Sequence, residues 1–290
     1  MTPFSLRQRL PLYAEVMRLH RPIGIWLLLW PTLWAVWIAG NGQPAWNIVL
    51  IFTLGVVLMR SAGCVINDWA DRDFDGQVSR TKGRPIADGR LPSREALYLF
   101  FFLIACSAAL LPFLNLATFF WSFGALALAS LYPFMKRFTY LPQVVLGAAF
   151  SWAIPMAYAA QDRTPDLICW LLYAANLVWT VAYDTQYAMA DREDDLKAGI
   201  KSTAILFGRY DLAIIGTLQV LFLMMMAAIG LKLHLGPVWP VCLGVAGGLF
   251  VWEYRHSRDR KPAHCTEAFL NNHKVGMALF AGLAISYVLQ

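Results

Sequence analysis

Long stretches of apolar residues, separated by short polar segments, run through the chain from residue 22 to its end. Hydrophobic residues make up 59% of the 290 residues, and the mean hydropathy is +0.52. A helix of about 20 apolar residues spans the hydrocarbon core of a bilayer. A soluble fold could not bury so much apolar surface. The pattern therefore predicts an all-α membrane protein with nine transmembrane helices, at 22–40, 44–66, 96–114, 116–135, 138–160, 167–183, 212–231, 233–252 and 275–290.

Basic residues are divided unevenly between the segments that join these spans. Of the 24 Lys and Arg residues, 22 fall on the side of the predicted bundle that holds the N-terminus, and Arg163 and Lys232 fall on the other. Because Lys and Arg collect in cytoplasmic loops, this division predicts a cytoplasmic N-terminus and an external C-terminus. The net charge of +6 is then a consequence of topology, and we do not expect nucleic-acid binding.

The chain is expected to form a single polytopic domain, 1–290, with three polar segments on the cytoplasmic side. Residues 1–21 carry apolar positions at helical spacing together with several Arg residues, which is typical of a helix lying on the inner leaflet. The segments 67–95 and 184–211 are the long predicted cytoplasmic loops, and both contain clustered carboxylates. The five cysteines show no paired metal-binding spacing, so we expect free thiols.

The two carboxylate clusters are partial copies of each other. Ala-Asp-Arg-Asp-Phe-Asp occupies 70–75 and Ala-Asp-Arg-Glu-Asp-Asp occupies 190–195, with four identical positions out of six. The first copy follows the second predicted span and the second follows the sixth. Four spans separate them, so both copies leave the membrane on the same side. This arrangement predicts two parallel four-helix pseudo-repeats plus one additional helix.

Each acidic segment places carboxylates on one face of a helix. In the first they are Asp68, Asp71 and Asp75, with Asn67 at the edge, and in the second they are Asp184, Asp191 and Asp195. Two such faces opposed across a bundle can hold Mg²⁺ and leave coordination positions for phosphate oxygens. A solvated acidic loop is the alternative. It does not explain why Asp184 ends an apolar span, where an unpaired charge is costly.

Basic residues follow both acidic segments and also end the span 116–135. Arg and Lys bind the oxygens of phosphates and carboxylates, so they suit a site for Mg²⁺ and a diphosphate. Each of them could equally serve only to set the topology. That alternative is weakest for Arg60 and Arg137, because both lie within or next to predicted membrane spans.

These motifs resemble those of a known family. The pattern Asn67-Asp68-x-x-Asp71-x-x-x-Asp75 resembles the first signature of the UbiA superfamily of intramembrane prenyltransferases, and Asp191-x-x-x-Asp195 resembles the second. Within that superfamily, further stretches resemble the 4-hydroxybenzoate polyprenyltransferases of ubiquinone biosynthesis. These stretches are 21–34, 60–68, 132–137, 141–150, 182–189 and 199–208, and the resemblance runs from about residue 15 to the C-terminus.

The resemblance implies nine transmembrane helices around a central cavity, capped by cytoplasmic loops, in the inner membrane of a bacterium. It implies transfer of a polyprenyl group from its diphosphate to the ring carbon ortho to the hydroxyl of 4-hydroxybenzoate, with Mg²⁺ as cofactor. The implied metal ligands are Asn67, Asp68, Asp71, Asp75, Asp191 and Asp195. The implied catalytic residues are Asp71, Asp75, Asp191, Asp195 and Arg137, and the implied substrate-binding residues are Arg21, Arg72, Lys82, Tyr132, Asp184 and Lys201.

Two finer roles are expected within that set. Arg137 or Arg21 is expected to hold the carboxylate of the acceptor, and Asp191 could accept its phenolic proton. Other acceptors remain open, because the acidic motifs alone do not distinguish 4-hydroxybenzoate from homogentisate, a naphthoate or haem. An ion-coupled membrane carrier is a further alternative. The crowding of polar groups on one side of the predicted bundle argues against a carrier.

Overall fold

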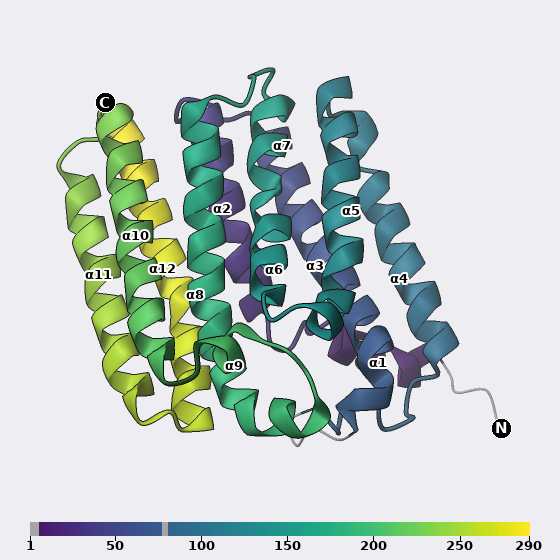
Figure 1. The fold of residues 1–290 in the computed structure, drawn as a ribbon. Helices are drawn as coiled ribbons and strands as arrows, with labels where there is room; N and C mark the ends of the chain where they lie inside the picture. Colours follow the sequence, from purple (N-terminus) through teal and green to yellow (C-terminus); the bar gives the residue numbers. More distant parts are fainter. Residues whose placement is uncertain (1–5, 77–80) are drawn as a thin grey trace.

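The structure, a computed structural model, describes residues 6–76 and 81–290, and over these residues it is entirely helical (Figure 1). Long helices run up and down side by side to form a bundle. The α-helices are α1 (Leu6–Val16), α2 (Ile23–Ala39), α3 (Trp46–Asp75), α4 (Ser93–Ala108), α5 (Leu116–Phe138), α6 (Pro142–Ser151), α7 (Ala153–Ala160), α8 (Leu167–Ala198), α9 (Thr203–Phe207), α10 (Asp211–Lys232), α11 (Val238–His256) and α12 (Pro262–Val288).

Six helical segments of the described chain are long and apolar enough to cross a membrane. They are Trp46–Asp73, Ser93–Phe113, Leu116–Phe138, Pro142–Ala160, Leu167–Ala198 and Thr203–Lys232. The helix Ile23–Ala39 is equally apolar but shorter, with 17 residues. The structure therefore confirms a multi-pass helical membrane protein. The count of nine spans stays a prediction.

The predicted span 138–160 is divided into two helices. The helix α6 ends at Ser151, and α7 begins at Ala153. The Trp152 amide donates to the carbonyl of Ala149, three residues back, at 3.3 Å. Pro155 has no amide proton, and its ring interferes with the carbonyl four residues earlier. This proline explains why the helix tightens and breaks at Trp152.

The two acidic segments are helical where loops were expected. The segments 67–95 and 184–211 were predicted as loops, but α3 continues to Asp75 and α8 continues to Ala198. Gly199 ends α8 in the left-handed conformation, with φ of 68°, which glycine adopts without steric cost. Hydropathy predicts where a helix leaves the membrane, not where the helix ends. Both helices continue beyond their apolar parts, and these continuations carry the carboxylates. Both ends lie on the same side of the bundle (Figure 1).

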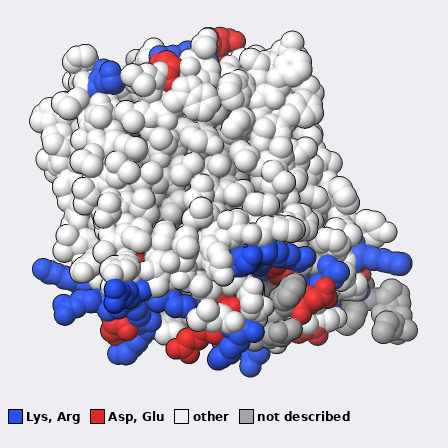
Figure 2. All heavy atoms as spheres, viewed as in Figure 1, with Lys and Arg blue, Asp and Glu red and all other residues white. Residues whose placement is uncertain are grey.

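Charged side chains gather at the two ends of the molecule. Figure 2 shows Lys, Arg, Asp and Glu at the top and bottom of this face, separated by a broad band of uncharged residues. Large apolar side chains point outward within that band, for example Phe102 on α4 and Phe120 on α5, which are 64% and 63% exposed. An uncharged belt of this kind fits a bilayer around the bundle.

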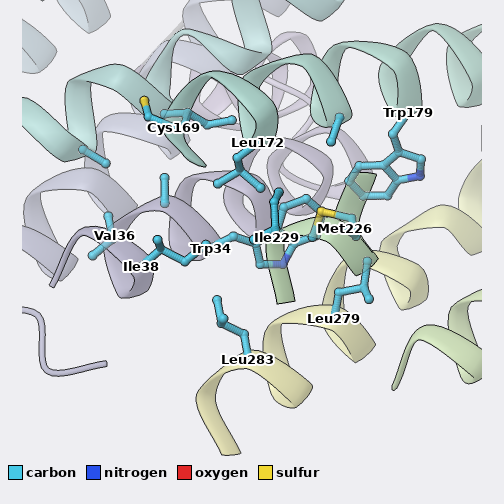
Figure 3. Packing of buried hydrophobic residues seen from close by; sticks show 14 of the residues in the cluster. Trp34, Val36, Ile38, Cys169, Leu172, Trp179, Met226, Ile229, Leu279 and Leu283 are labelled. Carbon is cyan, nitrogen blue, oxygen red and sulfur yellow. The ribbon is translucent and has the colours of Figure 1, made fainter. Parts of the chain in front are cut away.

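The main core lies where α2, α8, α10 and α12 meet (Figure 3). Trp34, Trp179 and Phe222 are fully buried there, and Trp179 stacks on Phe222 with ring centroids 5.3 Å apart. The Trp179 indole N–H donates to Asn272 Oδ1 at 2.9 Å, and that of Trp34 donates to the Gly276 carbonyl at 3.2 Å. This core holds α8 in place, and α8 carries the second acidic segment.

Candidate active site

A cavity of about 1480 Å³ opens inside the bundle. One part of its lining is polar and comes from the end of the bundle where the acidic segments lie, with Arg18, Asn67, Asp68 and Asp184 among its residues. Another part is apolar and comes from α4, α5 and the turn between them, and it includes Leu114, Phe119, Phe123 and Leu126. A cavity with one charged region and a long apolar region suits a ligand that has an anionic head and a hydrocarbon tail.

The first acidic segment is held at the cavity by cationic side chains. Asp68 on α3 is buried, with 2% of its side chain exposed. Arg18 Nη2 donates to both of its carboxylate oxygens, at 2.9 and 2.7 Å, and Arg84 Nη1 lies 3.0 Å from Oδ1. Arg18 follows α1, and Arg84 lies in the segment between α3 and α4. These ion pairs therefore tie the N-terminal helix and that connection to the polar end of the cavity.

Asp71, one turn further along α3, is joined to the end of α5. Its buried carboxylate forms an ion pair with Lys136, and Arg137 Nη2 donates to the carbonyl of Ala70 at 2.7 Å. The backbone amide of Lys201, beyond α8, donates to the carbonyl of Lys136 at 3.1 Å. The end of α5 thus bridges the first acidic segment and the chain that follows the second. No pattern in the sequence indicates this bridge.

The second acidic segment lies along the end of α8. Asp184 lines the cavity, Asp191 is partly buried and Asp195 is buried. Between the last two, Arg192 Nη2 donates to Asp211 Oδ2 at 2.5 Å, and Arg260 also pairs with this fully buried carboxylate at 2.8 Å. The ion pairs of Asp211 fix the last turns of α8 against α10 and against the turn that precedes α12.

The structure brings together some of the expected site residues and not others. Arg21, Asn67, Asp68, Tyr132 and Asp184 line the cavity, and Asp71 and Lys201 lie beside its polar end through the contacts of Lys136. Arg72, Lys82 and Arg137 are not part of the lining. Lys82 is exposed, Arg137 is exposed and donates to the Ala70 carbonyl, and Arg72 donates to the Trp69 carbonyl of its own helix at 2.7 Å.

The expected metal ligands are not grouped as a metal site. Among the described residues, no three His, Cys, Asp or Glu side chains are placed to hold a metal ion. Asp68 and Asp71 face Arg18, Arg84 and Lys136 instead. The side chain of Asp75 lies outside the described residues. The available donors are carboxylate and amide oxygens, which Mg²⁺ prefers, and a positive charge already lies against each of the two buried carboxylates.

Arg60 is a cavity residue that the expected site residues did not include. It lies on α3, two turns deeper than Asn67, and lines the cavity together with Tyr132 and Tyr187. Its Nη1 donates to Cys64 Sγ at 3.0 Å, and its guanidinium carbon lies 5.9 Å from the centre of the Phe150 ring. Its Nε is buried without a hydrogen-bond partner, and none of the described carboxylates pairs with it. The one signal in the sequence was an arginine inside an apolar span.

Comparison with known proteins connects this cavity to a family. The sequence model of the UbiA prenyltransferase family matches residues 28–280, which include all of the cavity-lining part of α3 and α8. This chain belongs to the UbiA prenyltransferase family. It is 56% identical over 278 residues to the 4-hydroxybenzoate octaprenyltransferase of Ectopseudomonas mendocina, covering 96% of this chain and 94% of that protein. It is 58% identical over 275 residues to that of Azotobacter vinelandii, covering 95% and 93%.

Solved structures of this family share the fold. A UbiA homolog from Aeropyrum pernix superimposes with a TM-score of 0.79 at 24% identity, covering 90% of this chain and 97% of that chain. A UbiA homolog from Archaeoglobus fulgidus, described as bound to GPP and Mg²⁺, superimposes with a TM-score of 0.74 at 19% identity, covering 96% and 100%. The family resemblance seen in the two acidic signatures is confirmed.

Proposed function

We propose that this UbiA-family protein transfers a polyprenyl group from polyprenyl diphosphate to the carbon ortho to the hydroxyl of 4-hydroxybenzoate. The observation that carries the proposal is the cavity itself, which joins buried carboxylates and cationic groups at one end to an apolar lining at the other. The diphosphate would lie between the acidic segments, and the prenyl tail would extend along α4 and α5. The names of relatives that are 56–58% identical support the same substrates.

Mg²⁺ would be held by Asn67, Asp68, Asp71, Asp75, Asp191 and Asp195. When bound, it would neutralise the charge that develops on the diphosphate as the allylic C–O bond breaks. Asp68 and Asp71 must then exchange their ion pairs with Arg18, Arg84 and Lys136 for the metal. The released cationic side chains remain at the same end of the cavity, where they can bind diphosphate oxygens.

The acceptor would be oriented by Arg60. A guanidinium at the cavity wall with no carboxylate partner among the described residues is costly, because it is desolvated without a compensating charge. The carboxylate of 4-hydroxybenzoate would supply that charge through a pair of hydrogen bonds. Arg60 is better placed for this role than Arg137, which is exposed and bonded to Ala70, and than Arg21 at the exposed start of α2.

The remaining cavity residues would exclude water, stabilise the allylic cation and accept a proton. The apolar lining excludes water from the allylic cation character that develops when the leaving diphosphate takes the electron pair. Tyr132, Tyr183 and Tyr187 line the same cavity, and their rings would stabilise positive charge. The ring carbon would then form the new C–C bond and pass its proton to the departing diphosphate, which restores the aromatic ring. Asp184 lines the cavity and Asp191 does not, so we assign Asp184 as acceptor of the phenolic proton.

The membrane arrangement is part of the proposal. We infer nine spans, with α2, α11 and α12 added to the six long apolar segments, in the inner membrane of a bacterium. The N-terminus and the acidic ends of α3 and α8 would lie in the cytoplasm, and the C-terminus would lie outside. The end with most Lys and Arg is the one predicted to be cytoplasmic.

The reaction is tested with purified protein in detergent, where no gradient can drive a carrier. Mass spectrometry would identify the product formed from 4-hydroxybenzoate and polyprenyl diphosphates of several lengths, with Mg²⁺ or with EDTA. We expect prenylated 4-hydroxybenzoate only with Mg²⁺. Homogentisate, naphthoate or haem as the preferred acceptor would replace the proposed substrate, and no product at all would favour a carrier.

The site is tested with two carboxylate variants and a control. Asp71→Asn and Asp191→Asn should lower kcat by about 100-fold, the usual effect of removing a group that stabilises transition-state charge. Arg163→Ala is the control, because Arg163 donates to the carbonyls of Ile38 and Ala39 at the opposite end of the bundle. It should retain nearly full activity. Full activity in both Asp variants would refute the proposal that Asp71 and Asp191 hold Mg²⁺.

A further inference from the structure

The backbone of α2 passes against the guanidinium of Arg60 at Gly24. This buried glycine lies in the first turn of α2. A Cβ added at Gly24 would lie 2.2 Å from Arg60 Nε, 2.5 Å from Nη2 and 2.7 Å from Cζ. At Gly124, Gly230 and Gly276 a comparable approach is made by tryptophan rings, which is ordinary helix packing. At Gly24 it is made by a cation that lines the cavity.

Arg60 is thereby held on three sides. The backbone at Gly24 contacts its Nε side, Cys64 Sγ accepts from Nη1 at 3.0 Å, and the Phe150 ring lies below the guanidinium with its centre 5.9 Å away. These three contacts come from α2, α3 and α6. Gly24 and Arg60 are 36 positions apart in the chain, so the contact depends on how two helices pack.

We propose that Gly24 is a specificity-determining position, because the absence of a side chain there lets the Arg60 guanidinium lie where it recognises the carboxylate of the acceptor. This inference rests on the proposed function, in which Arg60 binds that carboxylate. Gly24 lines the same cavity, and we propose that it acts as a positioning residue through Arg60.

An added methyl group at Gly24 moves the guanidinium rather than the helix. The atoms it meets are the far end of a flexible side chain, so Arg60 can turn away while α2 keeps its position. Ordinary contact begins at 3.4 Å, so the nearest atom must move by more than 1 Å from 2.2 Å. A paired guanidinium–carboxylate contact is directional and does not survive that displacement. Gly24→Ala should therefore weaken acceptor binding about tenfold or more.

The test separates the two substrates in the steady-state kinetics of the full-length protein in detergent. Gly24→Ala should raise KM for 4-hydroxybenzoate about tenfold and leave KM for the polyprenyl diphosphate unchanged. The matched control is Gly244→Ala on α11, where nothing lies within 4 Å of an added Cβ, and both KM values should stay at the wild-type level. An unchanged acceptor KM in Gly24→Ala, or an equal rise for both substrates, would overturn the inference.

A double-variant cycle shows whether Gly24 acts through Arg60. In Gly24→Ala/Arg60→Ala the clashing atoms are gone, so its acceptor KM should equal that of Arg60→Ala. A further rise would overturn the inference. If Arg60→Ala alone leaves the acceptor KM unchanged, the proposed carboxylate anchor is wrong. If Arg60→Ala raises it and Gly24→Ala does not, only the inference on Gly24 fails.

The cycle also decides the case in which Gly24→Ala does not fold. Recovery of folded protein in the double variant would show that the methyl group conflicts with the Arg60 side chain, as the inference requires. If the double variant also fails to fold, Gly24 is needed by the backbone of α2 and not by Arg60, and the inference is overturned.

Discussion

Glu253 is a buried carboxylate that accepts hydrogen bonds from three side-chain amides. It lies near the end of α11 with none of its surface exposed. Asn271 donates to Oε1 at 3.0 Å, and Gln219 and Gln186 donate to Oε2 at 2.9 and 3.4 Å. Asn272 then donates to Gln186 Oε1 at 3.0 Å. The network joins α8, α10, α11 and α12 beside the second acidic segment.

Replacing Glu253 with Leu would remove the acceptor that three buried amides share. Hydrogen bonds between membrane helices contribute about 0.6 kcal/mol on average and up to about 1.7 kcal/mol, because the unfolded state in the membrane also finds partners. Three such bonds give a loss of about 2–5 kcal/mol. A loss of 1 kcal/mol lowers Tm by about 2–4 °C in large domains, so Glu253→Leu should lower Tm by about 4–20 °C.

The assay is thermal unfolding in detergent, with Glu253→Gln and Glu267→Leu as comparisons. Glu253→Gln keeps an acceptor oxygen and removes a buried charge, so we expect a Tm within about 4 °C of wild type. The side chain of Glu267 is 56% exposed, so its removal should have little effect. Equal Tm values for Glu253→Leu and wild type would refute the reasoning. If Glu253→Leu and Glu253→Gln lowered Tm equally, the carboxylate charge and not the hydrogen bonds would stabilise the bundle.

Three further predictions concern other parts of the molecule. Gly230→Ala should lower Tm by several degrees, because the added Cβ would lie 2.1 Å from Trp239 Nε1. The control is Gly216→Ala on the same helix, where the added Cβ meets nothing within 4 Å, so its Tm should be unchanged or higher. Equal Tm values for the two variants would contradict this. Arg18→Gln removes the hydrogen bonds from Arg18 to both carboxylate oxygens of Asp68, so trypsin should cleave within α1 several times faster. An unchanged cleavage rate would show that other contacts hold α1 in place. The Cys265 thiol is fully buried, so iodoacetamide should label it at pH 7.5 only after denaturation; rapid labelling of the folded protein would refute this.

Several features of the fold could be predicted from the sequence because they depend on local composition. Runs of apolar residues predicted helices in the right places, and the two acidic segments were expected on one side of the bundle, where Figure 1 places both. The spacing of Asp68 and Asp71 was sufficient to predict that both carboxylates lie on one face of a helix, since residues on one helix face keep their relation wherever the helix packs.

The partners of those carboxylates could not be predicted in the same way. Asp68 binds Arg18 and Arg84, and neither was among the expected ligands, whereas Lys82, only two positions from Arg84, is exposed. Neighbouring basic residues look equivalent in a sequence. Which of them reaches a carboxylate depends on where residues 81–92 lie relative to α3.

The sequence by itself determined that this chain is a multi-pass helical protein of the UbiA family with paired acidic segments, because hydropathy and helical spacing are local properties. The tertiary structure alone decided that Arg60 faces the cavity and that its guanidinium lies on Gly24 beside Phe150. Those residues come from three helices far apart in the chain. Their contact follows from helix packing, which depends on many weak interactions summed over whole interfaces. No short sequence motif encodes it.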